Sequence, residues 1–400
     1  MVYVPSNEIL DKYADVMVNF ALNKGQGIRA GEVVEIIVPE IAKPILPHLY
    51  KKVLLAGAHP LVKFLPDDME TLKYDYGSDE QIGFFPAKLL RGKVDEINHT
   101  LMVIADKNPT ALKNVDPKKI MLAQKAMHPY RKWREEKENT GKYSWTLCLY
   151  GTEAVAKEAG LSLEEYWDII IKSCFLDKED PVKIWTDTNN EIQRICEVLT
   201  DMKIDKVHVE ADGTDLWVTI GDKRRWLGGR GNNIPSFEIF TSPDWRGTNG
   251  KIKFTEPLYR YGNLIKGIEL EFKDGKIINF KADENEDLLK EMIDVDNADK
   301  IGEFSLTDGR MSNITKFMAE TLYDENVGGV QGNTHIAIGT SFDEAYDGPK
   351  EDLNDGLYKE LGFNKSAIHT DIVSTSKRKV TAHMKNGDKK VIYEDGQFKV

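Results

Sequence analysis

The stretch Val33-Val34-Glu35-Ile36-Ile37-Val38 decides the fold class of this chain, because it is a short and nearly continuous apolar run. Such runs are typical of strands that are buried on both faces of a parallel sheet. A helix-length segment from Ile41 to Gly57 separates it from a second run at Pro60 to Leu65, and a third run follows at His99 to Ala105. Strands separated by helix-length segments predict parallel crossover units, and therefore an α/β sheet with helices on both faces.

Helical patterns extend this part of the chain in both directions. Apolar residues at helical spacing predict a helix from Asn7 to Asn23. Residues 116–200 are predicted to be mainly helical, and Ser162 with Glu165 three residues later is typical of a capping box at a helix start. We therefore expect residues 1–200 to form an α/β N-terminal domain with a parallel sheet and flanking helices.

Past about residue 205 the pattern changes to period-two alternation of apolar and polar residues, with Gly-Asp and Gly-Asn turns. This alternation predicts successive strands, which we place at residues 206–210, 216–220, 251–254, 268–272 and 276–280. Four hundred residues also exceed what one compact domain usually holds. We therefore expect a second domain of α+β class over residues 201–400.

Composition excludes some kinds of partner. The chain has 54 basic and 66 acidic residues, so its formal net charge is −12. Nucleic acid is not expected as a partner, because phosphate contacts need a positive surface. An anionic membrane surface is disfavoured for the same reason, and no run of 18 apolar residues predicts a membrane span. A plain solubility role is the more common interpretation of such an acidic balance.

The N-terminal residues and the cysteines indicate the compartment. Met1 to Ser6 contains no basic region followed by an apolar stretch, so a secretory signal is not predicted. The three cysteines, Cys148, Cys174 and Cys196, are too few and too widely spaced for a disulfide framework or a cysteine-rich zinc site. We expect reduced thiols in a cytoplasmic protein.

Four short segments after residue 230 combine histidine or carboxylate side chains with apolar surroundings. His369 and Asp371 stand two apart, so a strand would point both to one face, where they could reach a divalent cation. His335 lies in Asn333 to Gly339, beside small and apolar residues. Each motif alone is also compatible with a surface ion pair or with a histidine bonded to a backbone carbonyl.

Two glutamates interrupt apolar stretches in the same half of the chain. Glu303 lies in Ile301 to Leu306, and Glu238 lies in Asn233 to Pro243. A carboxylate in such a context is costly to bury unless it is paired or binds a metal. Exposure on an alternating strand is the alternative. The glycine-rich segment Gly228 to Asn232 is interpreted as a turn, because it opens no predicted helix and matches no phosphate-binding fingerprint.

Taken together, these sequence motifs resemble those of one protein family. The series Asn-Ile-Pro…Glu-Ile-Phe-Thr-Ser-Pro, Gly-Glu, His-Ile-Ala-Ile-Gly and Ser-Ala-Ile-His-x-Asp is similar to the two-metal thermophilic metallo-aminopeptidase family of the aminopeptidase T and aminopeptidase S type. The order of the motifs agrees, and Glu303 follows Glu238 by 65 positions. The resemblance extends to the N-terminal half, as in Ile104 to Pro109.

The resemblance implies a set of metal ligands in a catalytic C-terminal domain. Its members are Glu238, Glu303, His335, His369 and Asp371, which would bind a pair of divalent metal ions: zinc, cobalt, manganese or possibly magnesium. The family also has a tyrosine soon after the first histidine motif. Tyr346 is the candidate, eleven residues after His335, whereas Phe342 is nearer the expected spacing but lacks a hydroxyl.

The implied activity is removal of N-terminal residues from short peptides by metal-activated water. Glu303 is the candidate proton shuttle, and Tyr346 is the candidate donor to the oxyanion. The resemblance also implies a homodimer whose active sites face a shared cavity. Two alternatives stay open: a metal-dependent hydrolase of another amide or of an ester, and a non-catalytic binding protein on a peptidase scaffold.

Overall fold

The computed structural model describes residues 3–113, 115–260 and 262–400. Contacts divide the chain into two compact units. The first unit comprises Met1–Thr186 and Arg230–Pro235, and the second comprises Asp187–Gly229 and Ser236–Val400. This division falls inside helix α11 (Pro181–Asp201), and the boundary predicted at residue 200 falls at the end of the same helix.

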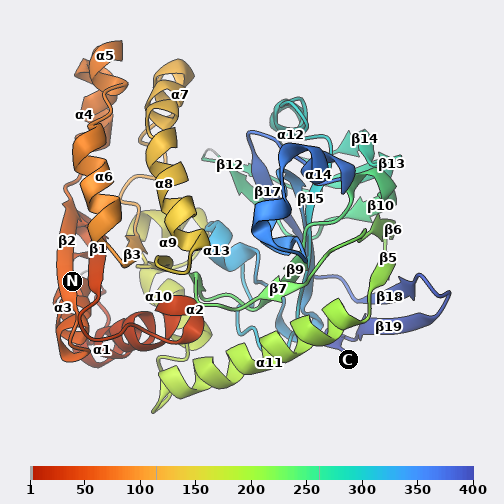
Figure 1. Ribbon diagram of the computed structural model, residues 1–400, viewed down its shortest axis with the longest axis horizontal. Helices are drawn as coiled ribbons and strands as arrows, with labels where there is room; N and C mark the ends of the chain where they lie inside the picture. Colours follow the sequence, from red (N-terminus) through yellow and green to blue (C-terminus); the bar gives the residue numbers. More distant parts are fainter. Residues whose placement is uncertain (1–2, 114, 261) are drawn as a thin grey trace. The chain divides into compact units, whose positions relative to one another are not determined.

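A five-stranded parallel sheet organises the first unit, in the order β2-β1-β3-β4-β8 (Figure 1). The predicted strand run is β1, whose Val34, Ile36 and Val38 are fully buried. The strands are β1 (Val33–Pro39), β2 (His59–Leu65), β3 (His99–Ile104), β4 (Ser144–Leu149) and β8 (Asn233–Ile234).

Helices and helical turns connect these strands. Helix α1 is capped by Ser6, and α10 begins with the predicted capping box of Ser162 and Glu165. Helix α6 packs along α8, and α5 along α7. The α-helices are α1 (Asn7–Val16), α2 (Leu22–Gly25), α3 (Leu46–Leu55), α4 (Met69–Tyr76), α5 (Asp79–Ile82), α6 (Ala87–Glu96), α7 (Pro117–Ala126), α8 (His128–Asn139), α9 (Glu153–Glu158) and α10 (Leu163–Ser173).

One element of this unit departs from the sequence prediction. Residues 116–200 were predicted as mainly helical, but β4 (Ser144–Leu149) lies within them and pairs with β3 over its whole length. Its Trp145-Thr146-Leu147-Cys148-Leu149 run is rich in residues that favour strands. The helical interpretation was wrong there, because a six-residue apolar run cannot be assigned from its period alone.

Two antiparallel sheets build the second unit. The larger has eight strands in the order β14-β13-β10-β6-β5-β18-β19-β20, and the smaller has five in the order β17-β16-β15-β9-β7. Apolar residues of both sheets form one core, for example Val207 and Leu216 from the larger and Phe304 and Ile336 from the smaller. The predicted α/β and α+β architecture is confirmed.

The five strands predicted between residues 206 and 280 correspond to β5, β6, β10, β13 and β14, and Asp274 and Gly275 form the turn between the last two. The strands are β5 (Ile204–Ala211), β6 (Thr214–Thr219), β7 (Leu227–Gly228), β9 (Glu238–Thr241), β10 (Asn249–Lys253), β11 (Leu258–Arg260), β12 (Asn263–Ile265), β13 (Glu269–Lys273), β14 (Lys276–Lys281), β15 (Ile301–Thr307), β16 (Asn333–Gly339), β17 (His369–Ser374), β18 (Arg378–Met384), β19 (Lys389–Glu394) and β20 (Gln397–Phe398); the helices are α12 (Glu286–Ile293), α13 (Thr321–Asp324) and α14 (Asp355–Glu360).

The helices were compared with what a membrane-spanning helix needs. In the parts of the chain that the structure describes, no helix combines the length and the apolar content that crossing a bilayer requires.

Candidate metal centre

The smaller sheet of the second unit carries five of the six predicted site residues on one face. Because side chains alternate along a strand, the residues between them face the other way into the core. These core residues are Ile239, Phe304, Leu306, Ile336, Ile338 and Ile372. The site residues are Glu238 on β9, Glu303 on β15, His335 on β16, and His369 and Asp371 on β17.

Strand register then brings these side chains together. Glu303 on β15 and Asp371 on β17 are both paired with Ala337 on the strand between them. The methyl side chain of Ala337 leaves space above it, so the two carboxylates can converge from either side. His369 is paired with Gly339 in the same way, so no side chain from β16 crowds its ring.

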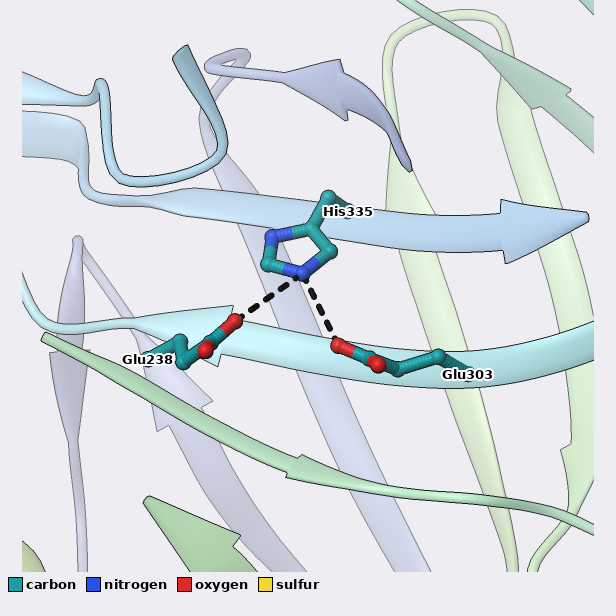
Figure 2. A group of neighbouring side chains, drawn as sticks. All are labelled: Glu238, Glu303 and His335. Carbon is teal, nitrogen blue, oxygen red and sulfur yellow. Dashed lines mark hydrogen bonds and ion pairs between the residues drawn. The ribbon is translucent and has the colours of Figure 1, made fainter. Parts of the chain in front are cut away.

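The five side chains form two groups that share Glu303 (Figure 2 shows the first). In the first group, His335 Nε2 lies 3.1 Å from Glu303 Oε1 and 3.4 Å from Glu238 Oε2. In the second, His369 Nε2 lies 3.5 Å from Glu303 Oε2 and 3.4 Å from Asp371 Oδ1. Each oxygen of Glu303 therefore faces a different histidine.

A backbone contact on the Nδ1 side of the ring fixes the orientation of the His369 imidazole. Its Nδ1 lies 2.8 Å from the Thr340 carbonyl oxygen, which can only accept, so Nδ1 carries the proton and Nε2 is left for the carboxylate side. Gly302 makes this possible, because a Cβ at that position would lie 2.2 Å from the same carbonyl oxygen. Glu238 is held similarly, since Ser236 Oγ donates to its Oε1 at 3.4 Å.

The electrostatics of the group reflect buried charges in contact. Burial raises the pKa of Glu238, and the neighbouring Glu303 raises it further. Burial alone would lower the pKa of His335, but its contacts with Glu238 and Glu303 outweigh this and raise the pKa well above its usual value. The pKa of His369 is raised in the same way by Asp371 and Glu303, and His369 in turn lowers the pKa of Asp371 to about 2.

The donor set fits divalent metal ions. Zinc–nitrogen and zinc–oxygen bonds of about 2.0–2.2 Å put neighbouring ligand atoms roughly 3.0–3.5 Å apart around one ion. The four histidine-to-carboxylate distances of 3.1–3.5 Å match that spacing. Metal ligation needs neutral imidazoles, and three ionised carboxylates beside two neutral imidazoles would carry a charge of −3, which a divalent cation would compensate.

Tyr346 is not brought to this group. It follows the short 3-10 helix Asp343–Ala345, is fully buried, and belongs to an apolar cluster with Leu227, Tyr358, Leu361 and Phe363. Its hydroxyl lies against Gly348. Within the described chain, none of its recorded contacts reaches the five side chains. Phe342, by contrast, lies directly on the site, with its ring centroid 4.6 Å from that of His369.

The sequence interpretation missed one acidic neighbour. Glu325, which follows α13, is buried; burial raises its pKa well above the usual value, and the charges of Glu238 and Asp371 raise it further. Asn326 places it, because its side chain accepts from Phe237 N at 2.6 Å and donates to Glu325 Oε1 at 3.4 Å. The polar run Asp324-Glu325-Asn326 after Leu322-Tyr323 was the available signal.

Histidine and carboxylate side chains gathered in this way define a class of proteins that could hold divalent metal ions. Comparison with known proteins is more specific. The chain belongs to the family described as thermophilic metalloprotease (M29), which matches residues 6–398. It is therefore a metal-dependent protease, and the resemblance predicted from its motifs is confirmed.

Relatives align over nearly their full lengths. Aminopeptidase AmpS of Bacillus subtilis is 28% identical, covering 97% of this chain and 98% of its own length. Aminopeptidase T of Thermus thermophilus is 26% identical, covering 97% of this chain and 95% of its own length. The solved structure of wild-type AmpT from Thermus thermophilus has the same fold, with a TM-score of 0.83, 23% identity, and 98% and 99% coverage of the two chains.

Proposed function

We propose that this protein is an aminopeptidase that uses two divalent metal ions. Glu238, Glu303 and His335 would hold one ion, and Glu303, His369 and Asp371 the other. The observation that carries the proposal is that the two carboxylate oxygens of Glu303 face different histidines: Oε1 faces His335, and Oε2 faces His369. The relatives named as aminopeptidases support the reaction class.

A metal pair supplies hydroxide near neutral pH and polarises the scissile carbonyl. The residues of this chain have separate tasks around it. Glu303, with both oxygens engaged, acts as the shared ligand. Glu325 is the better candidate for the acid that donates a proton to the leaving amine, because its burial and its acidic neighbours favour the protonated carboxyl. This changes the initial hypothesis that Glu303 is the shuttle.

Nitrogen and oxygen ligands without cysteine suit zinc, cobalt or manganese, and magnesium less readily. Short peptides are the proposed substrates, in keeping with removal of single N-terminal residues. The three cysteines are all buried thiols, which supports a cytoplasmic location.

A homodimer is the proposed assembly. In the first unit, β2 is the edge strand of its sheet and exposes apolar side chains along its length. They are Leu61, Val62, Phe64 and Leu65. Edge strands of this kind are normally protected, so a second copy of the chain is a suitable cover. Light scattering coupled to gel filtration tests this directly.

The decisive experiment is hydrolysis of aminoacyl-4-nitroanilides and short peptides after chelation, and again after adding back zinc, cobalt or manganese. Metal-dependent release of N-terminal residues supports the proposal and identifies a working metal. Stoichiometric metal binding without peptide hydrolysis would favour the two alternatives. Activity on other amides or on esters would then indicate a different hydrolase. No hydrolytic activity on any of these substrates would indicate a binding protein.

The division of roles has its own test. Glu325→Gln should keep both metal ions while lowering kcat roughly 10²–10⁴-fold, the usual contribution of a general acid or base. Glu303→Gln should lose metal as well as turnover. If Glu325→Gln retained full activity, the proton would have to be carried by another group.

A further inference from the structure

Phe342 is a large apolar side chain that stays partly exposed beside the metal centre. Its side chain is 36% exposed, although its ring lies 4.6 Å from the His369 ring, centroid to centroid. On its other side it meets Phe240 at 5.8 Å in an edge-to-face arrangement. Phe240 lies two residues after Glu238 on β9, so both point to the site face of the sheet. The two rings therefore form one apolar surface that meets the ligand group at His369.

The loop that carries Phe342 is firmly held. Phe342 N donates to Ser242 Oγ at 2.8 Å. On the preceding residue, Ser341 N donates to the Asn364 carbonyl and Asn364 N donates back to Ser341 Oγ at 2.9 Å. The exposed ring is thus presented by a rigid backbone, which is the condition for a selective binding surface.

The ligand group is more exposed at its outer members than at its centre. His335 and Glu303 have side chains that are 0% and 3% exposed, whereas Glu238 is 14% and His369 is 20% exposed. His369 is the most exposed of the five side chains, and a substrate that reaches the ligand group there meets Phe342. In an aminopeptidase only one residue precedes the scissile bond, so its side chain lies within one residue's reach of the reacting carbonyl. A ring in contact with a metal ligand is within that reach.

We propose that Phe342 and Phe240 form the binding surface for the side chain of the substrate's N-terminal residue and select apolar side chains there. This inference rests on the aminopeptidase function proposed above. An N-terminal leucine, methionine or phenylalanine removes apolar area from water when it packs on the two rings. Glycine gains nothing from this surface, and a charged side chain loses hydration on it.

The test compares kcat/KM for Leu-, Met-, Phe-, Ala- and Gly-4-nitroanilide in the metal-loaded wild-type enzyme and in Phe342→Ala. Wild-type enzyme is expected to prefer Leu over Gly by roughly 100-fold, and Phe342→Ala to reduce that ratio about tenfold, in line with the discrimination available from apolar contacts. Phe342→Leu keeps an apolar surface and should hold the ratio within about threefold of wild type. Phe84→Ala, which changes an exposed phenylalanine of the first unit, is the control.

A ratio separates selectivity from damage to His369, because a disturbed ligand lowers kcat/KM for every substrate alike. An unchanged Leu:Gly ratio in Phe342→Ala would overturn the inference while leaving the aminopeptidase function standing. A second comparison uses dipeptides X-Ala and Ala-X. A change confined to Ala-X would also overturn it, because the rings would then contact the residue that follows the scissile bond. Wild-type enzyme inactive on every substrate would refute the proposed function itself.

Discussion

The two ligand groups share Glu303 but differ in how far solvent reaches them. The His335 side chain is fully buried between two carboxylates, and its strand lies in the middle of the sheet. His369 lies on the edge strand β17, is one-fifth exposed, and has a backbone carbonyl behind its ring. Under the proposed function we expect a division of labour, in which the closed group around His335 would secure its metal and the open group around His369 would face the incoming peptide.

Removing the shared ligand should have the largest effect, because Glu303 belongs to both groups. Glu303→Gln is expected to lower kcat on the order of 10⁴-fold, as removal of a residue from a catalytic unit commonly does. Metal content by mass spectrometry should fall for both ions, while circular dichroism keeps the wild-type spectrum. Glu351→Gln, at an exposed position of the same unit, is the matched control. Unchanged turnover would remove Glu303 from the site and with it the shared-ligand arrangement.

Substituting each histidine in turn sharpens the comparison. His335→Ala leaves Glu238 and Glu303 buried without their partner, which typically costs about 3–5 kcal/mol. His369→Ala acts on a more exposed position, so its stability loss should be smaller, although activity falls in both. Thermal unfolding of the chelated proteins measures the difference. Equal losses of stability in the two variants would contradict the distinction between a closed and an open group.

The pH dependence of the chelated protein follows from the same contacts. The pKa of His335 is raised in the folded state, so the folded protein binds more protons than the unfolded chain above pH about 6.5. Its stabilising contribution is complete below that pH and is lost as the pH rises through the folded pKa. The melting temperature of the chelated protein should therefore fall by a few degrees toward pH 9.

Bound metal should reverse this trend, because ligation needs the deprotonated imidazole. The stabilisation gained on adding zinc is expected to grow from pH 6 to pH 9, measured by differential scanning fluorimetry of chelated and reloaded samples. The His335→Ala variant should lose most of the pH dependence in its chelated form. A chelated wild-type protein whose melting temperature rose across this range would argue against the charged contacts described for His335.

How much of this could be predicted from the sequence depends on how local each signal is. The strand β1 and the motifs around Glu238 and His335 carry their own patterns, and alternation alone places a motif's residues on one face. Glu325 carries no such pattern, since it follows a four-residue helix and its placement depends on the tertiary contact of Asn326 with Phe237. Likewise, Asn233–Ile234 joins the parallel sheet across a long separation, which no local pattern reveals.

The smallest effect is expected at Tyr346, where sequence spacing and structure point in different directions. Its role as an oxyanion donor stays a prediction from the family resemblance. Its side chain, however, is fully buried in an apolar cluster with Lys223 over the ring, and its hydroxyl lies against Gly348. A substrate could reach that hydroxyl only if the segment after β16 rearranged.

Tyr346→Phe keeps the packing and removes only the hydroxyl, so kcat should stay within about threefold of wild type. Removal of an oxyanion donor would instead lower kcat about 10²–10³-fold. A loss of that larger size, with metal content and melting temperature unchanged, would show that the loop closes over bound substrate. The open side of the site would then be closed during turnover by Tyr346 itself.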